Sequence, residues 1–413
     1  MVCYEAAHSK LKQFSDMASS TMNPKPIRPL YLTTAYYLAF IILGLATAVE
    51  GPSLPTLAKH TSSTLDQISL IFVVGAFGYL LGSIIGGRAF DRLPGHHFIA
   101  GTLSLLVVVA IIFPLAATLW VLLVAALFKG LCTGAVDVGC NTLLQWVHKE
   151  KVGPFMNGLH FSFGLGSFLS PLLLAEIFSA TQEIIWGFWI IALLIIPLAI
   201  WFWFLPELPA RTNTEPSNHS RIPFVPVALI VLAFFLYVGA EVGFANWIYT
   251  YAVTVNLATT ITAAYLTSAF WGLFTIGRLL GVWVSTRVHS KTILFLDMTG
   301  CLASLGLILL GRESAPMLWA GSIGLGFSMA SIFPTIMMLA GENMRVSGTI
   351  TGWFLVGAGA GGMLLPWLIG QAFTASGPYA MITIILCDLI LNGLLLTAFI
   401  YGIRPSAAVT SQA

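Results

Sequence analysis

An aspartate and an asparagine lie in the middle of one of the most apolar stretches of this chain. The stretch runs from Trp120 to Trp146, and its centre, GAVDVGCN, contains Asp137 and Asn141. The two residues are four apart, so in a helix they share one face. A carboxylate and a carboxamide on one face can bind a cation or the hydroxyl groups of a ligand. The alternative is a buried polar pair that only holds helices together.

The composition indicates a membrane protein. The chain is 58% hydrophobic and 8% charged, with a mean hydropathy of +0.92, whereas soluble domains carry roughly 25% charged residues. So few charges cannot cover a water-facing surface, and most of the surface must face lipid. A charged group inside a bilayer costs about 2.5–3.5 kcal/mol on insertion scales, so Asp137 is a functional candidate by default.

Other ligand classes find little support in the sequence. The net charge of +2 gives no reason to expect a nucleic-acid partner. The GxGxxG spelled by Gly357, Gly359 and Gly362 follows no strand, so we expect no nucleotide. The eight histidines are dispersed without metal-ligand spacing, and there is no nucleophile–base pair. We therefore expect no metal, no cofactor besides a coupling ion, and no enzymatic activity.

Apolar runs of about 20 residues predict twelve transmembrane helices. They lie near 31–52, 65–87, 97–117, 119–146, 154–178, 183–205, 223–254, 258–286, 291–311, 315–341, 347–373 and 378–403. The predicted organisation is a tail (1–30), a six-helix bundle (31–205), a polar linker (206–222), a second six-helix bundle (223–403) and a tail (404–413). With the N-terminus inside, fourteen of the 18 Lys and Arg fall in cytoplasmic loops or tails, which places both termini and the linker in the cytoplasm.

The two predicted halves repeat each other at a constant offset of 195 residues. The offset relates the following residues: Gly82, Gly86 and Arg92 to Gly277, Gly281 and Arg287, and Gly164, Gly166 and Pro171 to Gly359, Gly361 and Pro366. A constant offset over two separate helix pairs indicates that a six-helix unit was duplicated. Parallel repeats of this kind are typical of one large class of secondary transporters, which bind substrate at the midplane between the halves.

The loop GGRAFDRLPGHH, from Gly86 to His97, resembles the loop signature of the major facilitator superfamily. It departs from that signature by one extra residue before Gly95 and by histidines in place of the final basic pair. The resemblance implies an all-α membrane fold of twelve transmembrane helices in two pseudo-symmetric six-helix bundles. It also implies that Asp91 and Arg92 take part in a cytoplasmic gate.

Four further motifs resemble the fucose permease and sodium-dependent glucose transporter-like branch of sugar symporters. They are VDVGCN around Asp137, LHFSFGLGSFLSP from Leu159, YVGAEVGFANW from Tyr237 and ASIFPT from Ala330. The resemblance implies a neutral hexose or related polyol, carried with H⁺ or Na⁺. Fucose permeases place a second acid just before a proline in the first helix. Here Gly51 stands at that place and Glu50 comes one residue earlier.

The embedded polar and aromatic residues complete the predicted site. Substrate binding is predicted for Asn141, His160, Glu241, Asn246, Trp247, Trp271 and Trp353; cation coupling for Asp137 and Glu50; and gating for Asp91, Arg92 and Arg278. For each of them an interhelical packing role is the alternative. Lys129 is interpreted as structural, because it lies about 80° around the helix from Asp137.

The sequence thus predicts a cation-coupled sugar symporter that works by alternating access. We expect a monomer surrounded by lipid, in a bacterial inner membrane because the loops are compact. The main alternative is a proton-coupled exporter of drugs or metabolites in the same fold. A receptor is the second alternative, but neither the tails nor the 17-residue linker provides a signalling domain.

Overall fold

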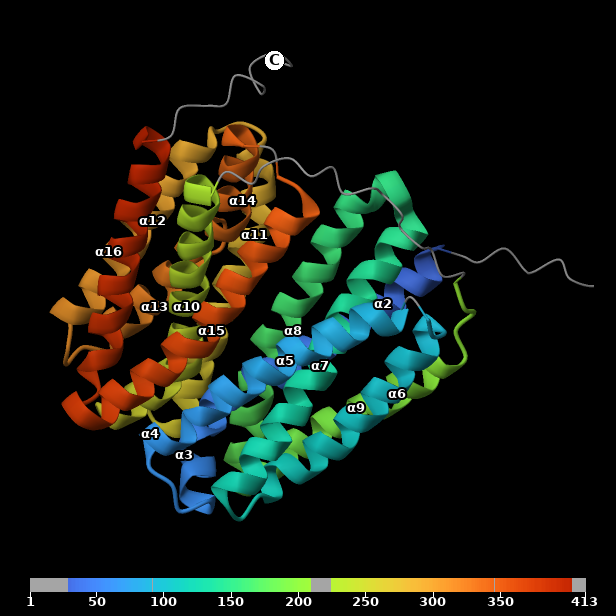
Figure 1. Cartoon of the computed structure of the whole chain (residues 1–413). Coiled ribbons are helices and arrows are strands. Elements are labelled where there is room, and N and C mark those ends of the chain that lie inside the picture. Colours follow the sequence, from blue (N-terminus) through green and yellow to red (C-terminus); the bar gives the residue numbers. More distant parts are fainter. Residues whose placement is uncertain (1–28, 91, 209–223, 345, 403–413) are drawn as a thin grey trace, which may run out of the picture.

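The computed structural model describes residues 29–90, 92–208, 224–344 and 346–402, and these residues form helices and connecting turns without a strand (Figure 1). The α-helices are α2 (Pro29–Ala48), α3 (Glu50–His60), α4 (Leu65–Ile68), α5 (Leu70–Phe90), α6 (Gly95–Ile112), α7 (Leu119–His148), α8 (Val152–Thr181), α9 (Ile185–Trp203), α10 (Phe224–Thr254), α11 (Thr260–Ser285), α12 (Ser290–Leu310), α13 (Ala315–Met329), α14 (Ile332–Asn343), α15 (Gly348–Ser376) and α16 (Tyr379–Gly402). Residues 1–28 and 403–413, Asp91, Arg345 and most of the predicted linker lie outside the described residues.

The number of membrane spans depends on how one long helical segment is divided. The described residues contain 11 helical segments that are long and apolar enough to cross a membrane, and the segment Leu119–Thr181 has 63 residues. At 1.5 Å per residue it would extend about 95 Å, roughly three times the hydrocarbon thickness of a bilayer. The 3₁₀ turn Lys149–Lys151, which begins with Lys149 at φ 51°, divides it into α7 and α8. This division gives the twelve predicted spans.

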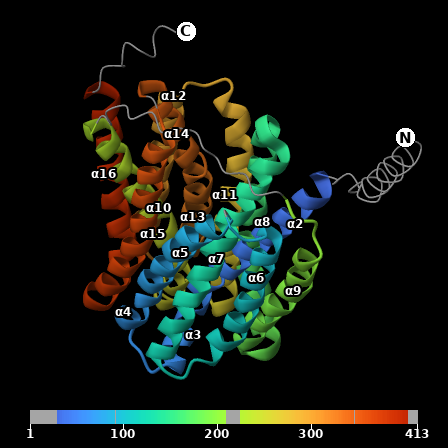
Figure 2. The same cartoon turned by 45° about the vertical axis from the view of Figure 1, so that its right-hand side comes forward.

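The helices gather into two bundles, one from each half of the chain (Figures 1 and 2). In the first bundle α2 packs on α8, α5 on α7 and α6 on α9. In the second, α10 packs on α15, α11 on α13 and α12 on α13. The bundles meet where α8 packs on α11 and α5 on α15. This arrangement confirms the predicted fold class.

The repeat is also visible in the helix packing. Gly82 of α5 lies against the backbone of Leu131 in α7, and its counterpart Gly277 of α11 lies against Phe327 in α13. Likewise Gly166 of α8 lies against Ile41 of α2, and Gly361 of α15 lies against Phe235 of α10. Small residues let transmembrane helix backbones approach closely. The equivalent glycines therefore bring equivalent pairs of helices into contact in both bundles.

The contacts between the bundles concentrate at the end of the molecule that holds α3 and α4, which we call the α3–α4 end. There the Gln371 side chain donates to the Asp66 carbonyl oxygen at 2.9 Å. The rings of Phe72 and Trp247 pack with centroids 6.4 Å apart. The bundles diverge toward the opposite end, where the described chain begins at Pro29 and ends at Gly402 (Figure 1).

Candidate functional site

Asp137 is held by neutral hydrogen-bond donors. Asn141 Nδ2 donates to Asp137 Oδ1 at 2.7 Å and to the Asp137 carbonyl oxygen at 2.9 Å. The hydroxyl of Tyr79, from α5, donates to the other carboxylate oxygen, Oδ2. Among the described residues, no cationic group forms an ion pair with Asp137. The site therefore holds a hydrogen-bonded carboxylate without a counter-charge from the described part of the protein.

The close packing of α5 on α7 positions this group. Gly78 and Gly82 of α5 lie against the backbones of Leu127 and Leu131, and Gly134 of α7 lies against the backbone of Tyr79. A side chain at any of these glycines would separate the two helices. Because the helices touch, the Tyr79 hydroxyl reaches Asp137 while 37% of the tyrosine remains exposed.

Glu50 is arranged differently, although it was predicted together with Asp137 as a coupling acid. It forms an ion pair with Lys129 of α7, and both side chains are about nine-tenths buried. Lys129 Nζ also donates to the Ala46 carbonyl oxygen at 3.1 Å. Lys129 thus pairs with an acid on another helix, and not with Asp137, which lies on the same helix as Lys129.

The second bundle contains an ion pair beside a cluster of aromatic rings. Glu241 of α10 is buried, and its Oε1 lies 4.0 Å from Arg278 Nη2 of α11. The Arg278 guanidinium lies 4.4 Å from the centroid of the Phe274 ring. Trp271 packs edge-on against Phe274, with centroids 5.5 Å apart. Three residues predicted from the sequence, Glu241, Arg278 and Trp271, are therefore close to one another.

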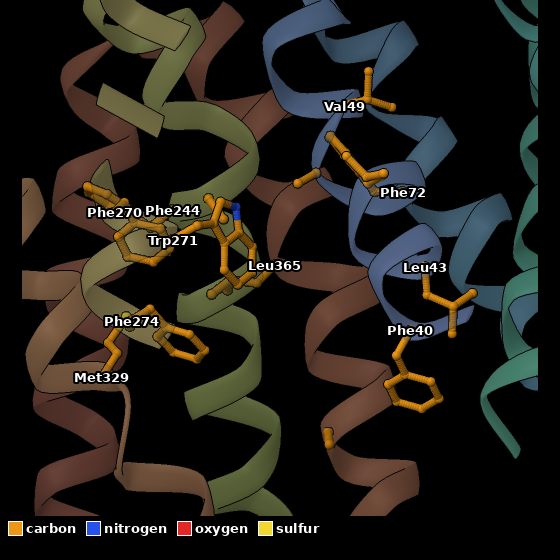
Figure 3. Packing of buried hydrophobic residues seen from close by; sticks show 14 of the residues in the cluster. Phe40, Leu43, Val49, Phe72, Phe244, Phe270, Trp271, Phe274, Met329 and Leu365 are labelled. Atoms are coloured by element: carbon orange, nitrogen blue, oxygen red, sulfur yellow. The ribbon is translucent and has the colours of Figure 1, made fainter. Parts of the chain in front are cut away.

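The aromatic cluster consists of Phe244, Phe270, Trp271 and Phe274, contributed by α10 and α11 (Figure 3). Its rings are almost completely buried, and 6% of Trp271 is exposed. An aromatic face can stack beneath a sugar ring, but in this conformation the Trp271 indole is covered mainly by its neighbours.

In the described part of the chain, no hydrogen bond or ion pair joins the remaining predicted residues to these two groups. Trp247 is fully buried, and its indole nitrogen donates to the Pro366 carbonyl oxygen at 2.8 Å. Asn246 donates to the Val242 carbonyl oxygen of its own helix at 3.0 Å. His160 is exposed and meets the Phe40 ring edge-on, with centroids 5.9 Å apart. Trp353 is 53% exposed near the start of α15.

The predicted gate is described only in part. Arg92 is exposed in the turn between α5 and α6, and Asp91 lies outside the described residues. Side-chain contacts that join the bundles were found instead at the α3–α4 end. Besides Gln371, the Tyr265 hydroxyl of α11 donates to Glu176 of α8 across the bundles. Sequence patterns gave no sign of these two contacts, because each partner comes from a different half of the chain.

The structure consists of two helical bundles, and ionisable side chains are buried among their apolar helices. This combination is typical of membrane transporters built from two bundles. Comparison with protein families agrees: the model of the Major Facilitator Superfamily matches residues 36–366. The chain belongs to the Major Facilitator Superfamily, and it is a transporter and not an enzyme.

Curated relatives match most of the chain. The sodium-dependent glucose transporter 1 of Xenopus laevis is 31% identical over 82% of this chain and 76% of its own length. The sodium-dependent glucose transporter 1A of Mus musculus is 27% identical, covering 81% of this chain and 88% of its own. The major facilitator superfamily domain-containing protein 4A of Homo sapiens is 25% identical over 90% of this chain and 91% of its own.

Solved structures share the fold at low sequence identity. A point mutant of the nucleoside transporter NupG has a TM-score of 0.71 at 15% identity, covering 90% of this chain and 98% of its own. A bacterial homologue of the human lysosomal transporter Spinster, in an inward-facing and occupied conformation, has a TM-score of 0.68 at 14% identity, covering 90% of this chain and 95% of its own. At these identities the likeness concerns the fold alone.

Proposed function

We propose that this protein carries a neutral hexose or a related sugar across the membrane together with a cation, and that Asp137 is the residue that binds the cation. The observation that carries the proposal is the Tyr79–Asp137–Asn141 group, in which no described cationic group pairs with the carboxylate. A coupling cation can neutralise such a carboxylate, which changes the free energy of closing the site around it.

The paired acids support the choice of Asp137 by contrast. Glu50 is neutralised by Lys129, and Glu241 lies 4.0 Å from Arg278. A cation that binds to a carboxylate already paired with a buried ammonium or guanidinium group must first displace that group. Asp137 requires no such displacement, because its donors are a phenol and a carboxamide.

The proposal that the substrate is a sugar rests on similarity and on the chemistry of the site. Two of the relatives named above are sodium-dependent glucose transporters. Hydroxyl groups of a sugar can hydrogen-bond to Asn141 and Glu241, and an aromatic face such as that of Trp271 can stack beneath its ring. Asn246, Trp247, Trp353 and His160 stay predictions as substrate-binding residues.

In an alternating-access cycle, the contacts between the bundles close one side of the transporter at a time. In the proposed cycle the α3–α4 end is the closed side of this conformation, and the end where the bundles diverge faces the cytoplasm with both termini. Arg92 and Arg278 belong to the proposed gate, as does Asp91 outside the described residues. We also propose a monomer in a bacterial inner membrane.

Uptake by purified protein in liposomes tests the proposal. Labelled glucose, galactose and fucose are offered separately under an inward pH gradient and under an inward sodium gradient. The expected result is saturable accumulation of one sugar under one of the two gradients. If folded protein takes up none of the three sugars under either gradient, the sugar assignment is wrong and the proton-coupled exporter becomes the better hypothesis.

A further inference from the structure

The first span is interrupted where α2 ends at Ala48 and α3 begins at Glu50. Pro52 and Pro55 follow the interruption, and a proline has no N–H to donate. The carbonyl groups of Ala48 and Gly51, four residues before them, therefore cannot accept the usual helical hydrogen bond. The last carbonyl groups of α2 also form the negative end of that helix.

Side chains from two other helices donate to this negative end. Ser170 Oγ of α8 donates to the Leu45 carbonyl oxygen at 2.8 Å. Lys129 Nζ of α7 donates to the Ala46 carbonyl oxygen at 3.1 Å and pairs with the Glu50 carboxylate. The ammonium group of Lys129 thus lies between the end of one helix and the acid in the first turn of the next.

A carbonyl oxygen and a carboxylate oxygen at a broken transmembrane helix are typical ligands of a transported or structural cation. In transporters with discontinuous helices, unwound carbonyl groups and helix C-terminal ends coordinate Na⁺. Here one oxygen of each kind contacts an ammonium group, which carries the same charge. The position lies inside the protein, since about 9% of Lys129 and 8% of Glu50 are exposed.

We propose that the interruption of the first span is a monovalent-cation site that the chain fills with its own Lys129 ammonium group. The tethered cation holds α7 against the junction of α2 and α3 and keeps free sodium out. One consequence rests on the proposed function: the coupling cation then binds at Asp137 and not at Glu50. The site itself does not depend on whether the protein transports a sugar.

Removal of the tethered cation tests this site directly. Lys129→Ala leaves the oxygens of Glu50 and Ala46 and frees the volume of the lysine side chain for an ion and water. The variant is purified in detergent, and its thermal unfolding is followed at increasing NaCl, with choline chloride added to keep the salt concentration constant. We expect sodium to raise its Tm saturably by about 2–4 °C or more, as a ligand of the native state does.

Two matched proteins make the result specific to this site. Every protein in this test carries Asp137→Asn, so that sodium at the proposed coupling site does not contribute. The protein that keeps Lys129 is then expected to show no difference between sodium and choline, because Lys129 occupies the site. The double variant Glu50→Gln with Lys129→Ala is also expected to show none, because it lacks the carboxylate. A Tm of Lys129→Ala that is equal in both salts, or a sodium effect of the same size in the double variant, would overturn the proposal.

Failure to fold is also informative in this design. If Lys129→Ala yields no folded protein even in sodium, while the double variant folds, then sodium does not replace the ammonium group and the proposal is wrong. The test measures Tm and the yield of folded protein, and it does not involve sugar uptake. It therefore remains valid even if the proposed function is wrong.

Discussion

The two bundles share their packing but differ in their polar residues. The residue 195 positions after Tyr79 is Phe274, and the residue 195 positions after Asp137 is Ile332. Both counterparts are buried hydrophobic residues, so the second bundle has no equivalent of the Tyr79–Asp137 hydrogen bond. The duplication therefore kept the glycines that let helices touch, whereas the polar groups between them diverged.

The ion pairs of the two bundles also occupy different positions. By the same offset, Glu241 corresponds to Ala46 and Arg278 corresponds to Ser83, so the second bundle pairs α10 with α11. In the first bundle the buried Glu50–Lys129 pair joins the interrupted first span to α7. The proposed cation site, Asp137, thus lies in the first bundle, whereas Glu241 and Trp271, two of the proposed sugar contacts, lie in the second.

Apart from Asp137 itself, the largest effect is expected at Tyr79, whose counterpart in the second bundle lacks the hydroxyl. Tyr79→Phe removes a hydrogen bond to a charged group, an interaction of about 1.5–3 kcal/mol. Without this hydrogen bond the cation-free carboxylate is less stable, so we expect Asp137 to bind its cation more tightly and to release it more slowly. Gradient-driven uptake should therefore fall about tenfold. Initial rates of uptake at several cation concentrations measure this change.

Tyr37→Phe is the control for Tyr79→Phe. It removes a hydroxyl that donates to the Phe155 carbonyl oxygen at 2.9 Å in the same bundle, away from Asp137. Its cation dependence should equal that of the wild type. If both variants behave alike, the Tyr79 hydroxyl acts on packing only and Asp137 does not need it.

Substitution of paired glycines tests whether the bundles are equivalent in packing. Gly166→Ala and its counterpart Gly361→Ala each place a methyl group against the backbone of a neighbouring helix, at Ile41 and Phe235. Overpacking of this kind costs about 1–3 kcal/mol, so both variants should unfold at lower temperature than the wild type, by similar amounts. Thermal unfolding in detergent provides the measurement.

Gly393→Ala serves as the reference for the glycine pair. A side chain there meets no neighbouring atom within 4 Å, so its Tm should match or exceed that of the wild type. Destabilisation at Gly166 but not at Gly361 would mean that the repeat no longer packs in the same way in both halves.

The smallest effect is expected at Trp247. Trp247→Phe keeps an aromatic ring beside Phe72 and removes the hydrogen bond to the Pro366 carbonyl oxygen. A hydrogen bond of this kind contributes about 0.5–1.5 kcal/mol to the free energy of unfolding. We expect a decrease in Tm, from the lost hydrogen bond and from the smaller buried ring, and an unchanged apparent KM for the sugar. A KM raised about tenfold with an unchanged Tm would instead support the substrate-binding role predicted from the sequence.

The fold could be predicted from the sequence because its signals are local or periodic. Span length, hydropathy and the constant offset are properties of the order of residues, and each has its counterpart in the helices and the glycine contacts. The close approach of Asp137 to Asn141 was also predictable, because residues four apart lie about one helical turn from each other.

The partners from other helices could not be predicted in this way. Spacing along one helix placed Lys129 about 80° around from Asp137 and indicated a structural role, but it could not identify the partner of Lys129, which is Glu50 of another helix. Tyr79 was missed because a tyrosine in an apolar span is not unusual in itself. A comparison of the repeats would have found it, since its counterpart Phe274 lacks the hydroxyl.

The central claim is that Asp137 couples cation binding to transport, and one comparison tests it most directly. Gradient-driven accumulation and equilibrium exchange of the same sugar are measured in liposomes for the wild type, Asp137→Asn and Asp297→Asn. Asp297 is a matched acid, held by Ser331 at 2.7 Å in the second bundle. We expect Asp137→Asn to lose accumulation about tenfold or more yet keep exchange, and Asp297→Asn to keep both. Accumulation at the wild-type level by Asp137→Asn would contradict the claim.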